Sequence, residues 1–566
     1  MARTALASAE TVLATLLAWV AARTWRRVLV TAALALAILI PGTASLPVTD
    51  RDEGRFVQAS KQMLESGDLI DIRFQDRPRW KKPVGIYWLQ AAAALPFGAT
   101  EAPIWAYRLP SLLGVVMAAV LLGWAVRPLV GAEAATLAGL MLPATVLAAG
   151  EANIAKTDAA LLATGVAILG AVARLVTEAP RPSLTLALAL WTALAAAILI
   201  KGPIVPAIAI LALVTLWILT RRAPPLSRLR PLPGLALTVA LVAPWLVAIW
   251  QVSDGAFFAE SVGRDLLGKV AEGQEKHWGP PGLYLALVWL TLWPWAALLV
   301  TAAPWLWTER HRLMVIALAA WVIPFWLVLE AVPTKLPHYV LPLYPALLAL
   351  IAAWALAPER PPPSRTLRIV AAWLVALPGA LLLVAMLVLP LVLEARLPLA
   401  LLLIAPIAAA ALALAALAAR HGKALPQIGA SLIAAGALYT GVLGHALPAL
   451  DTAFPSARAA ALAQPWQACA DGPLISAGYR EPSLVFHTAT RTHLATPEEA
   501  ARALTERPGA LVLLEDRWRP LLAEHWQSPP TLIERARLTY FNYNRGKTET
   551  ARLVTSTDPR WGPCED

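Results

Sequence analysis

An acidic cluster interleaved with arginine follows the first long apolar segment of the chain. Residues 50–56 read DRDEGRF and include Asp52, Glu53 and Arg55. A carboxylate held at a membrane surface beside a cation suits a general base, because its neighbours and partial burial can tune its pKa toward the working pH. Ordinary juxtamembrane charge is the alternative explanation. The residues that follow, 57–64, predict a short amphipathic helix that lies in the membrane interface.

Positive charge gathers further along the same segment. Residues 77–83 read RPRWKKP, and the aromatic stretch after them contains Tyr87 and Trp88. The side chains of Lys81, Lys82 and the arginines beside them could hold a phosphate at headgroup level and stabilise the charge that builds up on it as it leaves. An anchor at the membrane interface is the alternative for these cations.

Other ionisable residues stand at the ends of later apolar segments. Asp158 is the last residue of the stretch NIAKTD at 153–158. It is predicted to be a functional carboxylate or a helix N-cap, and one residue can be both. Lys201 stands in a tight Lys-Gly-Pro turn, where it either binds a ligand or only snorkels toward water. Further candidates for holding phosphate or sugar hydroxyls are Arg264, Lys269, His277, Trp278, Lys335, His338 and Tyr339.

The chain lacks the sequence motifs of metal-dependent and nucleotide-dependent enzymes. It contains no HExxH, no P-loop and no GxGxxG, so neither nucleotide hydrolysis nor a dinucleotide cofactor is indicated. We therefore expect no metal ligands and no required cofactor beyond a substrate, and leave a divalent cation open. The two cysteines, Cys469 and Cys564, are too far apart for a CxxC motif and could pair in an oxidising compartment.

Composition places the chain in a membrane. Of its 566 residues, 58% are hydrophobic and only 15% are charged, a proportion too low to cover a water-soluble domain of this size. The net charge of +11 does not indicate nucleic-acid binding, because the arginines cluster in short loops between apolar runs. In such loops they set topology and contact anionic lipids.

About thirteen apolar runs come close to the roughly 20 residues that a spanning helix needs. The basic loops between them all fall on one side, which predicts a cytoplasmic N-terminus and an outer location for residues after about Asp451. Residues 11–22 are too short to span and predict an interfacial helix. The runs are 28–44, 109–126, 134–149, 159–173, 184–200, 204–219, 235–250, 283–300, 313–329, 339–356, 369–392, 397–419 and 428–447.

This topology brings the chemically interesting residues to one face. The connections 46–107, 151–158, 253–281 and 330–338 and the turn at Lys201 all emerge outside. Residues 1–450 are thus predicted to form a membrane domain whose first outer loop, 46–107, carries the acidic motif. Residues 451–566 predict a small outer α/β domain, with β-like runs at 474–477, 483–486, 510–514 and 531–540 and a helix at 497–506.

These motifs resemble the GT-C class of polytopic glycosyltransferases, both in their order along the chain and in their shared position on one side of the membrane. Within that class they resemble the branch of bacterial aminoarabinose transferases of lipid A and relatives of protein O-mannosyltransferases. The resemblance covers nearly the whole chain. It rests on Asp52-Glu53 with Arg55 and Phe56, Lys82-Pro83, Arg108-Leu109-Pro110, Asn153 to Asp158, Lys201-Gly202-Pro203 and Lys335-Leu336-Pro337-His338-Tyr339.

The resemblance implies a polyprenyl-phosphate sugar donor, attacked by an acceptor hydroxyl or phosphate with inversion at the anomeric carbon. It implies Asp52, Glu53 and Asp158 as catalytic residues, with Asp52 at the reaction centre. The donor phosphate would be bound by Lys82, Lys81, Arg55, Arg264, His277 and Lys335, and the substrates by Tyr87, Lys201, His338 and Tyr339. It also implies the inner membrane of a bacterium, with the C-terminal domain in the periplasm.

Two residues depart from the aminoarabinose transferase pattern. Lys81 stands where an acidic residue is usual, and Phe56 stands where tyrosine is common. One fewer carboxylate and one more cation suit an acidic sugar, such as a uronic acid, better than an amino sugar. We therefore state an acidic donor sugar as a hypothesis.

Other functions remain open at this point. A lipid-linked-sugar transporter or flippase fits the helix count, although its expected paired halves are missing and the ionisable residues crowd into outer loops. A protein O-glycosyltransferase of the same class and a polysaccharide ligase are nearer alternatives. The sequence leaves open the identity of the sugar and of the acceptor, glycolipid or protein, and the oligomeric state.

Overall fold

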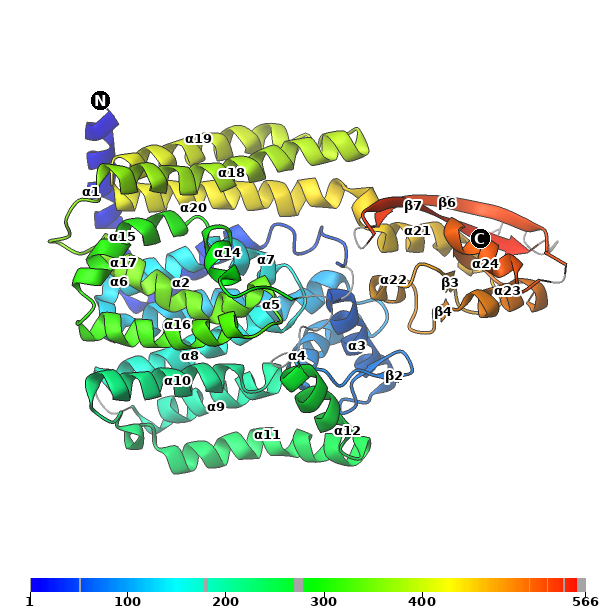
Figure 1. Cartoon of the computed structure of the whole chain (residues 1–566), viewed down its shortest axis with the longest axis horizontal. Helices are drawn as coiled ribbons and strands as arrows, with labels where there is room; N and C mark the ends of the chain where they lie inside the picture. Colours follow the sequence, from blue (N-terminus) through cyan, green and yellow to red (C-terminus); the bar gives the residue numbers. More distant parts are fainter. Residues whose placement is uncertain are drawn as a thin grey trace.

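The structure is a computed structural model that describes residues 2–49, 52–177, 182–268, 278–507, 509–526, 528–542 and 545–556. A bundle of long helices forms one end of the molecule, and a smaller domain with a β-sheet forms the other (Figure 1). Helices of the bundle and its outer loops are α1 Ala2–Ala21, α2 Thr24–Leu39, α3 Asp52–Ser66, α4 Gly85–Ala94, α5 Ile104–Ala125, α6 Arg127–Met141, α7 Val146–Ala152, α8 Thr157–Val176, α9 Leu184–Lys201, α10 Ile204–Thr220, α11 Pro231–Ser253, α12 Ala256–Phe258, the π-helix η4 Ala259–Leu267, α14 Leu283–Thr291, α15 Ala296–Thr308, α16 Leu313–Ala331, the 3-10 helix η5 Pro337–Leu343, α17 Tyr344–Ala355, α18 Arg365–Glu394, α19 Ala400–Arg420 and α20 Ala424–Gly441.

The membrane character of the bundle is confirmed, with fewer spans than the thirteen predicted. By length and composition, ten helices in the described part of the chain can cross a membrane, or twelve if each of two bent pairs counts as one span. The run predicted at 28–44 lies in α2, which has only 16 residues and ends just before Pro41. A proline cannot continue the helical hydrogen bonding, and it biases the residue before it away from helix.

Residues 11–22 were predicted to be too short to span a membrane, and this was wrong, because they belong to the longer apolar helix α1. It is long and apolar enough to span, but Figure 1 shows it running across the ends of the other helices, at the end farthest from the C-terminal domain. Its Glu10 carboxylate lies 2.6 Å from Lys423 Nζ and 4.0 Å from Arg360. These two cations come from separate loops that were predicted on the same side, so the structure supports that shared sidedness.

The C-terminal domain has the predicted α/β character. The mixed sheet has the order β4-β3-β5-β7-β6, with β3 parallel to β4 and β5, and apolar clusters cover both of its faces. Its elements are α21 Pro455–Gln467, β3 Ile475–Ala477, α22 Pro482–His487, β4 His493–Ala495, α23 Pro497–Glu506, β5 Val512–Glu515, α24 Arg519–Ala523, β6 Leu532–Asn542 and β7 Lys547–Ser556; the outer loop of the bundle adds the small hairpin β1 Arg73–Phe74 and β2 Arg77–Pro78.

One predicted strand of this domain was wrong, and two strands were missed. The run 483–486 was predicted as a strand but forms helix α22, whose first residue is Pro482. Proline at the first helical position is preorganised for a helix start, and a four-residue apolar run does not distinguish strand from helix. Strands β4 and β7 were not predicted. Helix α23 has the predicted bounds and starts with a capping box from Thr496 to Glu499.

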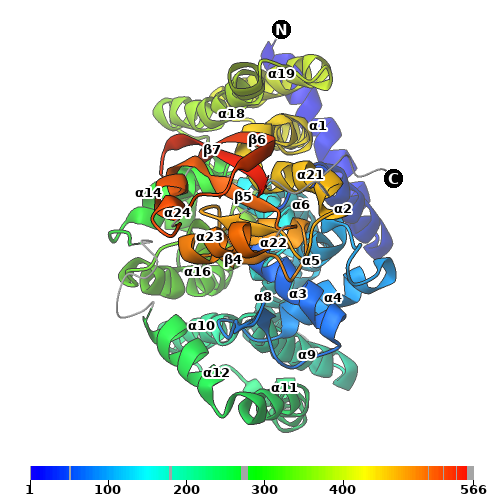
Figure 2. The ribbon, with the colours of Figure 1, turned by 90° about the vertical axis from the view of Figure 1, so that its right-hand side faces the viewer.

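The C-terminal domain sits on α3, the helix that begins at Asp52. Viewed from that end, the domain lies in front of the central helices, with α22 next to α3 (Figure 2). A Cβ atom on Gly54 would lie 2.7 Å from the backbone nitrogen of Ser483, so only glycine permits this approach. Gln58 Nε2 also donates to Thr490 Oγ1 at 2.7 Å. The helix predicted at 57–64 is confirmed as part of α3, but most of its side chains are buried against protein, which differs from the predicted position in the membrane interface.

Candidate active site

A polar cavity opens at the end of the bundle that faces the C-terminal domain. Its inner free volume is about 70 Å³, and its mouth opens to solvent. Six separate parts of the chain form its wall: the first turn of α3, the segment before α4, the start of α8, the C-terminal end of α9, η4, and the connection from α16 to η5.

Most of the site residues predicted from the sequence meet in this cavity. They come from segments up to almost 290 positions apart, so their meeting supports the predicted sidedness of the outer loops. The predicted residues in the wall are Asp52, Arg55, Lys81, Lys82, Asp158, Lys201, His338 and Tyr339. The roles assigned to them remain predictions.

The cavity also contains residues that sequence reasoning missed. Lys156 and Asp265 line it together with Thr157 and Thr334, and Arg79, from the cationic stretch predicted at 77–83, lines it as well. Lys156 stands two positions before Asp158, so the motif at 153–158 could have indicated it. Asp265 carried no signal of its own, because a single acid in a long loop is common.

Asp52 is the accessible carboxylate of the site. It is the first residue of α3, its side chain is 60% exposed, and its Oδ1 lies 3.9 Å from Arg55 Nη1. An acid in the first turn is favoured there because the helix dipole is positive at that end. This exposure leaves Asp52 free to meet a substrate group.

Buried ion pairs hold the lysines around the floor of the cavity. Lys201 Nζ lies 2.5 Å from Asp158 Oδ1. Lys156 Nζ lies 2.9 Å from Glu151 Oε1 and 3.2 Å from His338 Nδ1. His338 Nε2 in turn lies 3.8 Å from Asp158 Oδ2. These contacts fix two ammonium groups and an imidazole within one network.

The ammonium group of Lys156 stays protonated in this network. Burial by itself would favour the neutral amine, but the carboxylates of Glu151 and Asp158 outweigh it and raise the pKa of Lys156 above its usual value. Lys82, which also lines the cavity, lies 2.5 Å from Asp265 Oδ2. The site therefore presents several fixed positive charges to a ligand.

Glu53 lies in a different environment from its neighbour Asp52. Its carboxylate pairs with Arg108, at 2.8 Å from Nε and 3.0 Å from Nη2, and both side chains are fully buried. It also accepts hydrogen bonds from the backbone nitrogens of Thr49 and Ala155. Burial would raise the pKa of Glu53, but Arg108 and these hydrogen bonds outweigh it and hold that pKa below its usual value. Glu53 is thus a buried structural anion that does not line the cavity.

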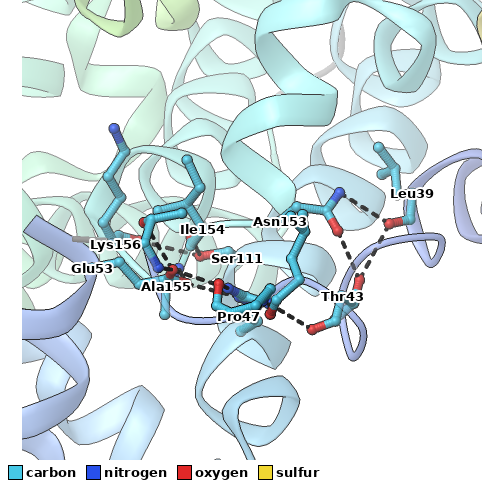
Figure 3. A network of polar contacts seen from close by, with 12 residues as sticks. Leu39, Thr43, Pro47, Glu53, Ser111, Asn153, Ile154, Ala155 and Lys156 are labelled. Carbon is cyan, nitrogen blue, oxygen red and sulfur yellow. Dashed lines mark hydrogen bonds and ion pairs between the residues drawn. The ribbon is translucent and has the colours of Figure 1, made fainter. Parts of the chain in front are cut away.

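The Glu53–Arg108 pair belongs to a polar network that holds several loops together (Figure 3). Arg108 donates to the carbonyls of Thr43, Leu46 and Pro47. Asn153 donates to Leu39 O at 3.2 Å and accepts from Thr43 Oγ1. Ser111 Oγ donates to the carbonyls of Ile154 and Lys156. The network therefore joins the start of α3 to the segment that carries Lys156 and Asp158.

Removal of Arg108 is expected to destabilise the whole fold. Arg108→Met leaves Glu53 charged and buried without its cation, which typically costs about 3–5 kcal/mol. We expect a correspondingly lower free energy of unfolding in detergent, measured by chemical denaturation. Arg502→Gln, which removes an exposed arginine of α23, is the matched control and should change stability little. A double variant with Glu53→Gln should lose less than the sum of the two single changes.

Three of the predicted residues lie outside the first cavity, and three other residues named from the sequence fall outside the described part. Lys335 is buried, and its ammonium donates to the carbonyls of Leu329, Glu330 and Val332, which caps α16. Tyr87 is buried beneath Phe56, with ring centroids 5.4 Å apart. Arg264 lies in a neighbouring cavity and pairs with Glu260 at 3.1 Å. The residues that fall outside the described part are His277, Lys269 and Cys564.

No group of three or more His, Cys, Asp and Glu that could hold a metal ion occurs in the described part of the chain. The expectation that no metal or cofactor is required stays a prediction.

Comparison with known proteins agrees with this architecture. The family described as "Dolichyl-phosphate-mannose-protein mannosyltransferase" matches residues 48–253. The undecaprenyl phosphate-alpha-4-amino-4-deoxy-L-arabinose arabinosyl transferase of Aeromonas salmonicida is 28% identical over 348 residues, 61% of this chain and 62% of that protein. The protein of the same name from Yersinia pestis is 27% identical over 318 residues, 55% of this chain and 56% of that protein. The matches thus span less than two thirds of these curated relatives.

The similarity to solved structures covers almost the whole chain. ArnT from Cupriavidus metallidurans bound to undecaprenyl phosphate has a TM-score of 0.73 at 20% identity, covering 95% of this chain and 99% of that one. The same protein in the apo state has a TM-score of 0.71, covering 93% and 97%. At this level of identity the likeness establishes the fold. The chain is therefore a polytopic membrane protein with the GT-C fold of the aminoarabinose transferases.

Proposed function

We propose that the chain is an inverting glycosyltransferase that moves a single sugar from a polyprenyl-phosphate donor to an envelope acceptor such as lipid A or lipopolysaccharide. The reaction would take place on the periplasmic side of a bacterial inner membrane. The observation that carries the proposal is the cavity itself, which combines an exposed carboxylate, Asp52, with the fixed ammonium groups of Lys82, Lys156 and Lys201 at one end of an apolar bundle.

The geometry supports a displacement at the anomeric carbon. An acceptor oxygen forms a bond to that carbon as the bond from the carbon to the donor phosphate oxygen breaks, and polyprenyl phosphate leaves with the bonding electrons. If the acceptor is a hydroxyl, Asp52 takes its proton. If the acceptor is an ionised phosphate, Asp52 orients it. The lysines stabilise the charge that develops on the leaving phosphate, and they are held in place before the reaction begins.

The relatives support the donor class. The matched proteins of Aeromonas salmonicida and Yersinia pestis are named for a sugar on undecaprenyl phosphate, and the solved ArnT structure contains undecaprenyl phosphate. The alternative of a protein acceptor is favoured by the mannosyltransferase family match at 48–253. A transporter of lipid-linked sugars is the alternative of another class.

A donor-consumption assay tests the proposal. The full chain in detergent is incubated with polyprenyl-phosphate sugars and with lipid A or a hydroxyl-rich peptide, and released polyprenyl phosphate is measured by mass spectrometry together with glycosylated acceptor. We expect both products in equal amounts. The transporter alternative replaces the proposal if no donor is consumed but a lipid-linked sugar crosses the bilayer of proteoliposomes that contain the chain.

Lys81 provides a test of the donor sugar. It lines the cavity where the aminoarabinose transferases usually have an acid, so an acidic sugar is the proposed donor. Lys81→Glu reverses this charge, and we expect turnover on a uronic-acid donor to fall about tenfold or more, since charged hydrogen bonds contribute about 1.5–3 kcal/mol. Turnover on a neutral-sugar donor is the control. Unchanged turnover on the acidic donor would contradict the hypothesis.

A further inference from the structure

A large polar groove lies between the first outer loop and the C-terminal domain, and we call it the outer groove. One wall is formed by α3 and the hairpin β1–β2, and the other by Arg480, the loop before β4 and the start of α23. Its free volume is about 1110 Å³, larger than the roughly 300–1,000 Å³ that is usual for small-molecule pockets. This size fits an extended ligand better than a small metabolite.

The outer groove follows the proposed active site through a second cavity between them. This second cavity lies between the hairpin and the helices α12 and η4, and it shares Phe74 and Arg77 with the outer groove. It shares three other lining residues with the first cavity: Arg55, Arg79 and Lys81. A single long ligand with its reactive group at Asp52 can therefore extend past the hairpin into the outer groove.

The outer groove lies outside the membrane part of the fold. None of the described residues that line it belongs to a helix long and apolar enough to span a membrane, whereas the first cavity includes the ends of α8 and α9. Figure 1 shows the hairpin and β4 beyond the ends of α8, α9 and α10, toward the C-terminal domain. The groove is thus suited to a water-exposed part of a substrate and not to a lipid tail.

The lining of the outer groove matches a ligand rich in hydroxyl groups. Thirteen of its sixteen lining residues are polar or charged, and its three arginines are balanced by three acids. A hydroxyl both donates and accepts hydrogen bonds; the arginines can donate to it, the acids can accept from it, and the glutamines and threonines can do both. A phosphate or carboxylate only accepts, and it would be repelled by Glu65, Asp76 and Glu499.

Hydrogen bonds between the two walls fix the width of the groove. Gln75, at the tip of the hairpin, donates from Nε2 to the carbonyls of Thr490 at 2.9 Å and Thr492 at 2.5 Å. Its backbone has a φ of 54°, a left-handed conformation that glycine and asparagine adopt more easily. Gln62 Oε1 accepts from Gln75 N at 2.7 Å and holds the tip from the other side. The groove is therefore preorganised, which lowers the entropic cost of binding.

On the basis of the proposed function, we propose that the outer groove binds the part of an acceptor glycan that lies beyond the reacting group. The reacting oxygen lies at Asp52, the glycan passes the hairpin, and its outer sugars bind between the hairpin and the C-terminal domain. The C-terminal domain thus makes the enzyme selective for a glycolipid with an extended saccharide, such as lipid A that carries a core oligosaccharide. Lipid A alone is a weaker acceptor, because it fills less of the groove.

Acceptor kinetics with the full-length chain in detergent test the proposal. The transfer rate is measured at saturating donor over a range of concentrations of lipid A alone and of lipid A that carries a core oligosaccharide. Arg491→Gln is the main variant, because Arg491 is exposed and, of the three cavities, lines only the outer groove. Thr100→Trp, at an exposed turn, narrows the groove by bulk. Arg502→Gln, at an exposed arginine of the same domain that lines none of the cavities, is the matched control.

The expected result is a change that depends on the glycan. In the unmodified chain, the KM for the core-bearing acceptor should lie about tenfold below that for lipid A alone. Arg491→Gln should raise the KM for the core-bearing acceptor about tenfold, because hydrogen bonds from a charged group are lost, and change that for lipid A much less. Thr100→Trp should show the same selectivity, and Arg502→Gln should change neither value.

Binding of the oligosaccharide alone separates this proposal from the proposed function. The oligosaccharide released from its lipid is added to the full-length chain without donor, and contact is detected by saturation-transfer NMR. We expect binding to the unmodified chain and to Arg502→Gln, and weaker binding to Arg491→Gln and Thr100→Trp. If no donor is consumed with any acceptor, the proposed function fails, and this binding still decides whether the groove holds a saccharide.

Three results would overturn the proposal. One is an equal KM for the two acceptors in the unmodified chain. Another is a rise in KM in Arg491→Gln that is as large for lipid A alone as for the core-bearing acceptor. The third is a hydroxyl-rich peptide that binds the groove when the oligosaccharide does not, which would assign the groove to a protein acceptor.

Discussion

Replacing Asp52 by asparagine is expected to reduce sugar transfer to a hydroxyl acceptor by about a hundredfold to ten-thousandfold, the usual contribution of a general base. The amide keeps the size of the side chain but cannot accept the acceptor's proton. Because Asp52 is 60% exposed at the start of α3, the fold should persist, with a melting temperature close to that of the unmodified chain. The rate of formation of glycosylated acceptor is the measurement.

The control for this change is Glu101→Gln, which removes another exposed carboxylate of the same outer loop that lines none of the three cavities. It should leave transfer unchanged. If Asp52→Asn retained a rate within about twofold of the unmodified chain on a hydroxyl acceptor, Asp52 would not be the base, since a general base contributes at least about a hundredfold.

Lys82→Met is the second change with a large expected effect. The ammonium of Lys82 is fixed by Asp265 at the cavity wall, where it would stabilise the charge on the leaving phosphate. Loss of one such preorganised donor typically lowers kcat by about a hundredfold to a thousandfold. We expect that loss in the rate of polyprenyl phosphate release, measured in a single turnover at saturating donor.

Lys82→Arg should recover part of the rate of polyprenyl phosphate release, because the guanidinium keeps the positive charge but differs from the ammonium in geometry. Lys547→Met, at an exposed position in β7, serves as the control for the loss of one lysine. An unchanged kcat with a raised donor KM would contradict the role in the transition state, and would show that Lys82 contributes only to binding.

The sequence predicted on which side of the membrane each loop lies. Because most of the site residues were predicted on the same side, most of the site was predicted with them. Lys and Arg in short loops set topology through a simple electrostatic rule, which does not depend on tertiary contacts. It was therefore possible to predict, without knowing how the helices pack, that one end of the bundle carries Asp52, Asp158, Lys201 and His338. The partners within the cavity could not be predicted, because contacts such as Lys82 with Asp265 join segments 183 positions apart.

Neighbouring residues were harder to separate. Asp52 and Glu53 were predicted as catalytic together, but successive residues of a helix point about 100° apart. Asp52 thus faces the cavity, and Glu53 faces the interior, where it pairs with Arg108. The same problem affects Arg264 and Asp265, which line different cavities. A sequence motif identifies the turn that carries the chemistry, and only the packing decides which of its residues performs it.

The number of spans and the strands of the C-terminal domain were predicted less well, because the local sequence fits more than one structure. Two apolar stretches of the described chain bend inside the membrane domain, one of them by 117° between α14 and α15, so an apolar run is not always one straight span. Strand β7 reads KTETARLVTS, with few apolar residues in its first half, and gave no strand signal. It forms because β5 and β6 pair with it on both sides.

The most direct test of the central claim is the fate of the donor's sugar in one purified system. The unmodified chain and Asp52→Asn are each incubated in detergent with isotope-labelled polyprenyl-phosphate sugar and lipid A, and both products are followed by mass spectrometry. The account predicts that the unmodified chain moves the label to lipid A with equal release of polyprenyl phosphate, and that Asp52→Asn, correctly folded, does so at least about a hundredfold more slowly when a hydroxyl of the acceptor is glycosylated. Labelled sugar that stays on its polyprenyl phosphate in the unmodified chain, across the donors and acceptors supplied, would contradict it.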